Sequence, residues 1–219
     1  MKLYQYHHCP FCVRADMVAN YKQVEHEKVF LANDDEPTCF DLIGAKMVPI
    51  LELDDGTAMA ESLDVCARFD ELGDPAAVIL DARPEQEQAA MALLDGVRKS
   101  IRCLLFPRNI NLGLPEFASQ ASRDYFQNKK EAIIEQTFEQ ALADTEHHKA
   151  MVETTLAQLP ALSLPADHQQ QISWSDVIIY PTLRNLTMVK DLNIPPAVMT
   201  YLQQVASVTN THLYLDHAI

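Results

Sequence analysis

Short alternating and helical hydrophobic patterns fill the first 73 residues of the chain. Four segments alternate or form brief apolar runs that are typical of strands: 3–6, 25–31, 48–53 and 57–60. Apolar residues at helical spacing predict helices over 10–21, 38–43 and 63–72. Asp55-Gly56 indicates a hairpin between the last two strands. The predicted order is β-α-β-α-β-β-α, an α/β domain.

The pattern then changes to helical spacing throughout. Apolar stripes predict one long helix over 90–107, two further helices marked by 134–142 and 152–159, and a last one over 198–208. Segment 173–189 is apolar nearly all round, so we expect it to be the central buried helix. Ser173 and Asp176 fit a capping box at its start. The predicted division is an α/β domain over 1–73, a linker over 74–83 and an all-α domain over 84–219.

Composition narrows the class of protein. The 219 residues are 48% hydrophobic, enough for a sizeable core. A net charge of -14 argues against nucleic acid and anionic membrane surfaces as partners. No apolar run approaches the ~18 residues of a membrane span. Only eight residues precede Cys9, and the first strand takes most of them, so we expect no signal peptide and a cytoplasmic protein.

The junction of the first strand and first helix carries Cys9-Pro10-Phe11-Cys12. Proline suits the first helical position, which makes Cys9 the N-cap, at the positive end of the helix dipole. A free thiol titrates near ~8.5, whereas a pKa of about 5 would make it almost wholly thiolate at neutral pH. Because the thiolate is the nucleophile in disulfide exchange, we expect Cys9 to attack and Cys12 to resolve.

Two other interpretations of the cysteine pair are two neighbouring buried apolar thiols and half of a zinc site. Two neighbouring buried thiols would need no proline between them, and a zinc site would need a second ligand pair that the chain lacks. We therefore expect no metal. Cys39, Cys66 and Cys103 lie among apolar neighbours and are expected to be small buried hydrophobes. The distant histidines, His147 and His148 among them, are expected to be solvated.

Two further dipeptides are candidate binding residues. Val48-Pro49 fits a proline that starts an edge strand. A cis bond there would turn the Val48 amide and carbonyl outward beside Cys9, where they could pair with an extended peptide-like substrate. Glu61-Ser62 precedes a helix, and Ser62 is expected to be its N-cap. The same helix start could hold a substrate carboxylate, and Glu61 could pair with a substrate ammonium.

Taken together, Cys9-Pro10-Phe11-Cys12, Val48-Pro49 and Glu61-Ser62 resemble the cysteine pair, cis-proline and glutathione-holding residues of glutaredoxins. The order of the first half is thioredoxin-like. The helical half resembles the C-terminal domain of glutathione transferases, so the whole chain looks like the two-domain bacterial glutaredoxins of the glutaredoxin 2 type. One departure is Phe11, since the glutaredoxin motif usually has tyrosine there.

The resemblance implies a glutathione-dependent thiol–disulfide oxidoreductase. It would act on protein–glutathione mixed disulfides and protein disulfides, with glutathione as the reducing co-substrate and no bound coenzyme. Val48 and Pro49 would hold the cysteinyl part of glutathione, and Glu61 and Ser62 its γ-glutamyl end. The two-domain glutaredoxins look like monomers, which implies a monomer here.

Two other classes stay open from the sequence. A glutathione transferase that conjugates electrophiles would share the architecture, but Cys12 would be dispensable to it. A non-catalytic interaction module would carry a structural cysteine pair and no reactive thiol at neutral pH. Iodoacetamide labelling of Cys9 at acidic pH separates the module from the two enzymes, because only a low-pKa thiol reacts there.

Overall fold

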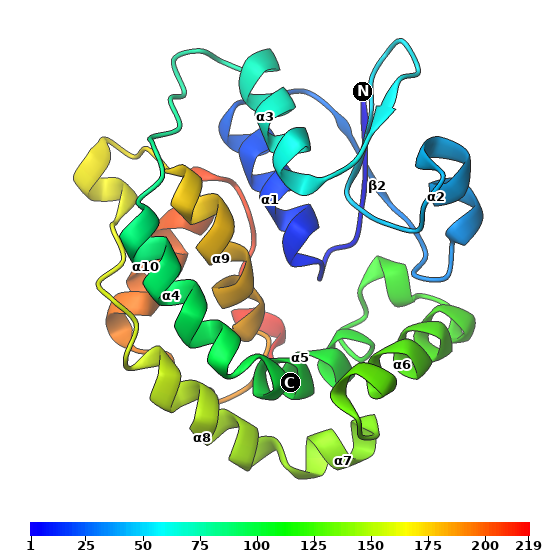
Figure 1. The fold of residues 1–219 in the computed structure, drawn as a ribbon, viewed down its shortest axis with the longest axis vertical. Coiled ribbons are helices and arrows are strands. Elements are labelled where there is room, and N and C mark those ends of the chain that lie inside the picture. The colour runs from blue at the N-terminus through cyan, green and yellow to red at the C-terminus, as the bar shows by residue number, and fades with distance from the viewer.

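A computed structural model describes residues 1–219 and contains one four-stranded sheet (Figure 1). Its strands are β1 (Lys2–Gln5), β2 (Glu27–Phe30), β3 (Ile50–Glu52) and β4 (Ala58–Met59), in the order β2-β1-β3-β4. Strand β1 runs parallel to β2 and antiparallel to β3, with Leu3 opposite Lys28 on one side and Leu51 on the other. This mixed topology is the predicted thioredoxin-like arrangement.

Three helices complete this half: α1 (Pro10–Tyr21), α2 (Glu36–Ile43) and α3 (Ser62–Leu72). Helices α1 and α3 pack together on one side of the sheet, and α2 lies on the other (Figure 1). Helix α2 begins two residues earlier than predicted, because the Asp35 carboxylate accepts the Thr38 N–H at 3.1 Å and Pro37 is tolerated in a first turn. Gly44 ends it in a left-handed conformation.

The second half is helical, as predicted. Its helices are α4 (Pro84–Gly96), α5 (Arg98–Asn109), α6 (Gln120–Ile134), α7 (Phe138–Ala143), α8 (Thr145–Leu156), α9 (Trp174–Leu186) and α10 (Pro196–Val208). Helix α9 contacts α1, α4, α5 and α10 and is largely buried, which confirms the prediction of a central helix. The Ser173–Asp176 capping box at its start is present as expected. None of the helices combines the length and apolar character needed to span a lipid bilayer.

Two predicted helix extents are wrong. The long helix over 90–107 is divided at Val97, whose φ of -115° breaks the helical backbone between α4 and α5. Its apolar stripe continues across the break because both helices pack on the same core. The 134–142 stripe likewise spans two helices. Glu135 takes a left-handed conformation after α6, and Thr137 starts α7 with a capping box that periodicity did not reveal.

The two halves share one core and one set of backbone hydrogen bonds. A cluster of 39 buried apolar side chains extends from Leu3 in the sheet to Tyr214 near the C-terminus. Leu80, in the segment without helix or strand that joins the halves, donates its N–H to Ile172 and accepts the N–H of Trp174. The start of α9 is therefore tied to the connecting segment, and the packing holds the sheet against the helices.

Candidate active site

The cysteine pair lies where β1 gives way to α1. Cys9 is the N-cap of α1 with an extended backbone, and Pro10 occupies the first helical position, as predicted. The Cys9 residue is partly exposed, whereas Cys12, one turn further on, is fully buried. The Tyr6 N–H donates a hydrogen bond of 3.4 Å to the Cys12 sulfur. Both thiols are free. One reachable sulfur thus lies beside one enclosed sulfur.

The surroundings shift the pKa values of the two thiols in opposite directions. A hydrogen bond with the Cys12 side chain lowers the pKa of Cys9 to about 6, and the charge of His8 and the amides of Phe11 and Cys12 add to this effect against burial. Burial, followed by the interactions with Cys9, raises the pKa of Cys12 well above its ordinary value. At pH 7 the Cys9 thiol, with its pKa of about 6, is about 90% thiolate. Cys9 is therefore the ionised partner and Cys12 the protonated one.

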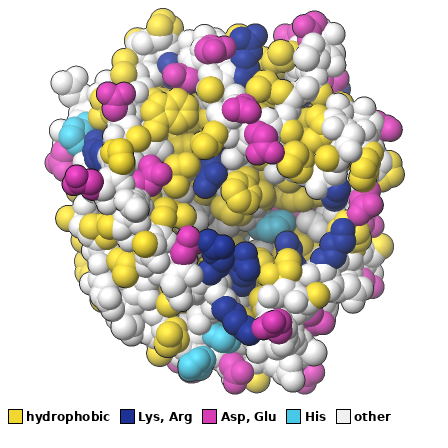
Figure 2. Space-filling model, viewed as in Figure 1, with side chains coloured by type: hydrophobic (Ala, Val, Ile, Leu, Met, Phe, Trp, Pro, Cys, Tyr) yellow, Lys and Arg dark blue, Asp and Glu magenta, His cyan; other side chains and the backbone are white.

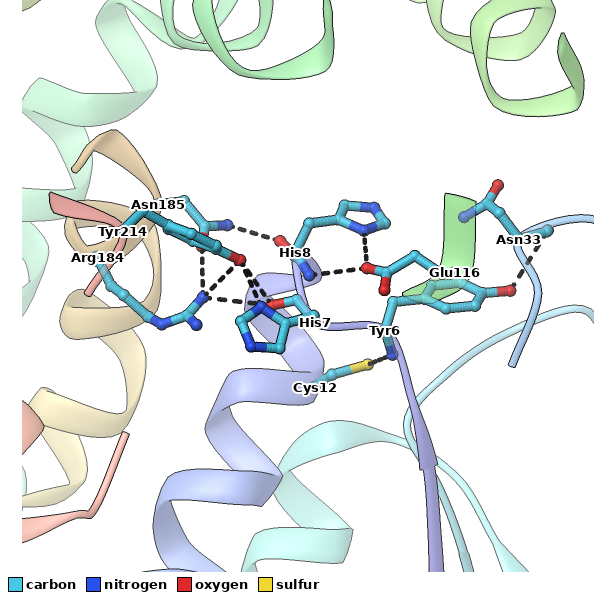
Figure 3. Close-up of polar contacts among 9 residues, drawn as sticks. All are labelled: Tyr6, His7, His8, Cys12, Asn33, Glu116, Arg184, Asn185 and Tyr214. Atoms are coloured by element: carbon cyan, nitrogen blue, oxygen red, sulfur yellow. Dashed lines mark hydrogen bonds and ion pairs between the residues drawn. The ribbon is translucent and has the colours of Figure 1, made fainter. Parts of the chain in front are cut away.

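His8, the residue before Cys9, is hydrogen-bonded to a buried carboxylate. The His8 Nδ1 donates to Glu116 Oε1 at 2.6 Å, and the His8 backbone N–H donates to the same oxygen at 3.0 Å (Figure 3). Glu116 is fully buried, and its other oxygen, Oε2, has no partner. Because Glu116 belongs to a 3-10 turn (Pro115–Phe117) of the helical half, that half supplies the counter-charge beside the cysteine motif.

Helix α9 also reaches the cysteine loop. Asn185 Nδ2 donates to the His8 carbonyl at 2.7 Å, and Arg184 donates to the His7 carbonyl at 3.3 Å and to the Tyr214 hydroxyl at 3.2 Å. Figure 3 shows these side chains meeting residues 7 and 8 from the helical half. In the sequence, Arg184 and Asn185 are polar positions in a largely apolar segment, and no local pattern identifies their partners. In the structure they anchor the backbone that precedes Cys9.

Val48, which precedes Pro49, lies beside the cysteine motif. The Val48–Pro49 peptide bond is cis. The Val48 N–H and carbonyl make no hydrogen bond within the chain, because β3 begins only at Ile50. Val48 lines the same cavity as Cys9. A free backbone donor and acceptor therefore stand beside the partly exposed thiol.

Glu61 and Ser62 lie at the start of α3, outside the lining of that cavity. The prediction that Ser62 caps α3 is wrong by one residue. Glu61 is the N-cap, with a φ of 66°, and Ser62 is the first residue of the helix. The Ser62 hydroxyl instead accepts a hydrogen bond of 3.4 Å from Arg14 in α1. Arg14 forms no ion pair, and its Nε is buried without a partner, so this helix start presents cationic and amide donors together.

Cys9 opens into a cavity of about 500 Å³ between the two halves. One wall comes from the cysteine loop and the segment before β3, and the other from α5, α6 and the C-terminal half of α9. No Asp or Glu lines this cavity. Five of the 17 Lys and Arg side chains of the protein do: Lys46, Arg98, Arg102, Lys129 and Lys130. In Figure 2, dark-blue side chains gather along the hollow at the centre of the molecule. A chain of net charge -14 thus surrounds its reactive thiol with cations.

Sequence reasoning missed this basic lining, as well as Glu116 and Arg14. The cations are spread over three separate segments of the chain, so no local run of charge signals them. Glu116 is one of 31 acidic residues and has no distinguishing neighbour in the sequence. Only the approach of the helical half to the cysteine loop brings these side chains together.

The remaining cysteines and histidines lie outside this site. Cys39, Cys66 and Cys103 are fully buried, as predicted. His147 is exposed as expected, but His148 is buried, which corrects its prediction: it packs against α5, with Ser100 Oγ at 3.2 Å from its Nδ1. The structure contains no group of three or more His, Cys, Asp or Glu side chains placed to hold a metal ion.

A thioredoxin-like sheet, a helical second half and a proline-containing cysteine pair with one ionised thiol define a thiol–disulfide oxidoreductase on a glutathione-transferase architecture. Comparisons with known proteins agree. Residues 8–72 match the family model for the glutathione S-transferase N-terminal domain, and residues 89–218 match that for the glutaredoxin 2 C-terminal domain.

Individual relatives identify the family. The chain is 34% identical to glutaredoxin 2 of Escherichia coli K12 over the full length of both proteins. The crystal structure of glutaredoxin 2 from Salmonella typhimurium, in complex with glutathione, superimposes with a TM-score of 0.87 at 35% identity, covering 100% of this chain and 98% of that one. A glutathione S-transferase from Xanthobacter autotrophicus shares only the fold, with a TM-score of 0.53 at 17% identity, covering 97% and 95% of the two chains. This chain belongs to the glutaredoxin 2 family and is a glutathione-dependent oxidoreductase.

Proposed function

We propose that Cys9 is the nucleophile and Cys12 the resolving thiol of this oxidoreductase. The contrast between the two thiols carries the proposal: Cys9 is partly exposed with a pKa of about 6, and Cys12 is enclosed with a raised pKa. A thiolate attacks disulfides, whereas a protonated thiol does not, so attack begins at Cys9.

The reaction on a mixed disulfide takes two exchanges. The Cys9 thiolate attacks the glutathione sulfur, a Cys9–glutathione disulfide forms, and the protein thiolate leaves and takes up a proton. A second glutathione thiolate then attacks the glutathione sulfur of that disulfide, which releases oxidised glutathione and regenerates the Cys9 thiolate. No metal or bound coenzyme enters either step.

A protein disulfide requires Cys12. Attack by Cys9 forms a disulfide with one protein cysteine and releases the other as a thiolate. Cys12 then loses its proton and attacks the Cys9 sulfur, which frees the second protein cysteine and leaves a Cys9–Cys12 disulfide. Two glutathione molecules reduce that disulfide.

Glutathione would lie along the sheet-side wall. The free N–H and carbonyl of Val48 support backbone pairing with its cysteinyl part, with Pro49 holding the segment beside Cys9. The start of α3 supports binding of the γ-glutamyl carboxylate by the amides, the Ser62 hydroxyl and Arg14. Exposed Glu61 is placed to pair with the γ-glutamyl ammonium. We propose a monomer that acts in the cytoplasm, since its five free cysteines suit a reducing compartment.

The test compares the intact protein with Cys9→Ser and Cys12→Ser in glutathione-coupled reduction of a small neutral mixed disulfide and of a protein disulfide. Cys9→Ser should lose both activities to background. Cys12→Ser should keep reduction of the mixed disulfide and lose most reduction of the protein disulfide. Equal loss of both activities in Cys12→Ser would contradict the assigned roles.

A further inference from the structure

The helical wall of the cavity carries positive charge that the protein itself does not neutralise. The side chains of Arg102 and Lys130 form no ion pair and no hydrogen bond. In contrast, Lys129 pairs with Glu36 and Arg98 pairs with Asp95. The Lys130 ammonium lies 5.2 Å and 5.4 Å from the ring centres of Phe106 and Phe126. Burial lowers the pKa of Lys130, and the nearby Cys9 thiolate opposes that effect.

A half-buried cation without a counter-ion is costly, because it loses hydration and gains no partner. The protein has 31 Asp and Glu residues, yet none of them lines the cavity. An anionic ligand that entered the cavity would therefore recover the lost interaction. Arg102 and Lys130 come from α5 and α6, across the cavity from the Val48 segment where glutathione is proposed to bind.

The geometry of disulfide exchange indicates which ligand meets this wall. The attacking, central and leaving sulfurs lie close to one line, and in a mixed disulfide the central sulfur belongs to glutathione. The protein sulfur therefore leaves away from Cys9, toward the opposite wall of the cavity. A cavity of about 500 Å³ admits an extended segment with a few side chains but not a folded domain.

We propose that Arg102 and Lys130 form a specificity surface for acidic segments, so that the enzyme prefers glutathionylated cysteines flanked by Asp or Glu. The inference rests on the proposed function, because it needs glutathione on the sheet side and the protein cysteine on the helical side. Acidic side chains next to the cysteine would reach the two cations, while the partly exposed ring of Phe106 would contact the apolar parts of the segment.

The test uses three peptides of equal length whose glutathionylated cysteine is flanked by glutamates, serines or lysines. The intact enzyme should show about tenfold higher kcat/KM for the glutamate peptide than for the lysine peptide at low salt, a size expected for two or three exposed charge pairs. The ratio should fall toward one at about 0.5 M salt, where charges are screened within a few ångströms.

Matched variants assign the preference to the wall. The double variant Arg102→Gln, Lys130→Gln should bring the glutamate-to-lysine ratio close to one, and Arg102→Glu, Lys130→Glu should reverse it. Lys190→Glu changes the same charge at an exposed position outside the cavity and should leave the ratio unchanged. The ratio within one variant is the readout because an effect on folding or on the Cys9 thiolate alters all three peptides alike.

Three results would overturn the inference: equal rates for the three peptides in the intact enzyme, a preference that survives in the double variant, or a loss of the same factor for every substrate. The last result would mean that the cations serve Cys9 or glutathione itself. A small neutral mixed disulfide, assayed in parallel, separates the two proposals. If the intact enzyme fails to reduce it, the proposed function fails and the inference falls with it.

Discussion

A hydrogen bond joins His8 and Glu116, two residues 108 positions apart in the chain, with His8 Nδ1 2.6 Å from Glu116 Oε1. His8 directly precedes the reactive Cys9, and Glu116 comes from the helical half. The pair is enclosed by Phe117 and Phe126, whose ring centres lie 5.0 Å and 5.3 Å from that of His8. The second half of the protein therefore acts directly on the electrostatics of the cysteine motif.

Replacing His8 by glutamine should raise the pKa of Cys9. The positive charge of His8 is one of the causes that lower that pKa to about 6, after the hydrogen bond with Cys12, and glutamine keeps a donor toward Glu116 without the charge. The rate of iodoacetamide alkylation against pH should have its midpoint near pH 6 in the intact protein and at a higher pH in His8→Gln.

At pH 6 the variant should react several-fold more slowly. His147→Gln, at an exposed position far along the chain, is the control and should leave the midpoint unchanged. An unchanged midpoint in His8→Gln would show that His8 does not stabilise the thiolate.

Glu116 should contribute stability that acid removes. Burial opposes its ionisation, but the hydrogen bond and charge of His8 outweigh burial and lower the pKa of Glu116 below its ordinary value of 4.5. A carboxylate with a lowered folded pKa stabilises the protein above the unfolded pKa, and that stability is lost as the pH falls through the folded pKa. Urea unfolding between pH 7 and pH 3 should therefore show a smaller acid loss in Glu116→Gln than in the intact protein. Parallel curves for the two proteins would refute this contribution.

Asn185→Ala should destabilise the protein by about 1–3 kcal/mol, because it leaves the buried His8 carbonyl without its donor at 2.7 Å. The same change should slow the reaction at Cys9, since that carbonyl positions the start of the cysteine motif. Asn193→Ala removes the same side chain at an exposed site where it makes no hydrogen bond, and its unfolding curve should match the intact protein. Equal curves for all three proteins would exclude the anchoring role.

Gly73 should tolerate no side chain. A Cβ at this position would lie 2.5 Å from the Lys22 Cβ and 2.6 Å from the Lys22 carbonyl oxygen. Gly73→Ala should therefore cost about 1–3 kcal/mol through overpacking. Gly96, the last residue of α4, has nothing within 4 Å of such a Cβ, so Gly96→Ala should be neutral or stabilising by up to about 1 kcal/mol. Chemical unfolding of both variants measures the difference, and a neutral Gly73→Ala would disprove the close approach of α3 to Lys22.

Ser62→Ala should weaken the use of glutathione. If the start of α3 holds the γ-glutamyl carboxylate, loss of the hydroxyl should raise the KM for glutathione by about tenfold, a typical cost of one hydrogen bond to a charged group. The kcat should change little, because Ser62 does not touch the reacting sulfurs. Ser207→Ala, at an exposed position of α10, is the control. A KM unaffected by Ser62→Ala would move the γ-glutamyl end elsewhere.

Much of the fold followed from local patterns. The helix over Pro10–Tyr21 was predicted at its observed bounds, because proline suits its first turn and apolar residues follow at helical spacing. The buried helix α9 was evident from its apolar sequence and capping box. Helix divisions at Val97 and Glu135 were missed, because an apolar stripe records which face meets the core and not whether the backbone is continuous.

The cysteine pair and its likeness to a family were readable from the sequence alone, because Cys9, Pro10 and Cys12 are neighbours whose chemistry depends on a local strand-to-helix junction. The tertiary structure decided what surrounds that pair. Glu116, Asn185, Arg102 and Lys130 reach it from the distant helical half, and their effect depends on burial and distance, which spacing along a chain does not encode. The sequence determined the local setting of the Cys9–Cys12 pair, and long-range packing decided which charged side chains surround it.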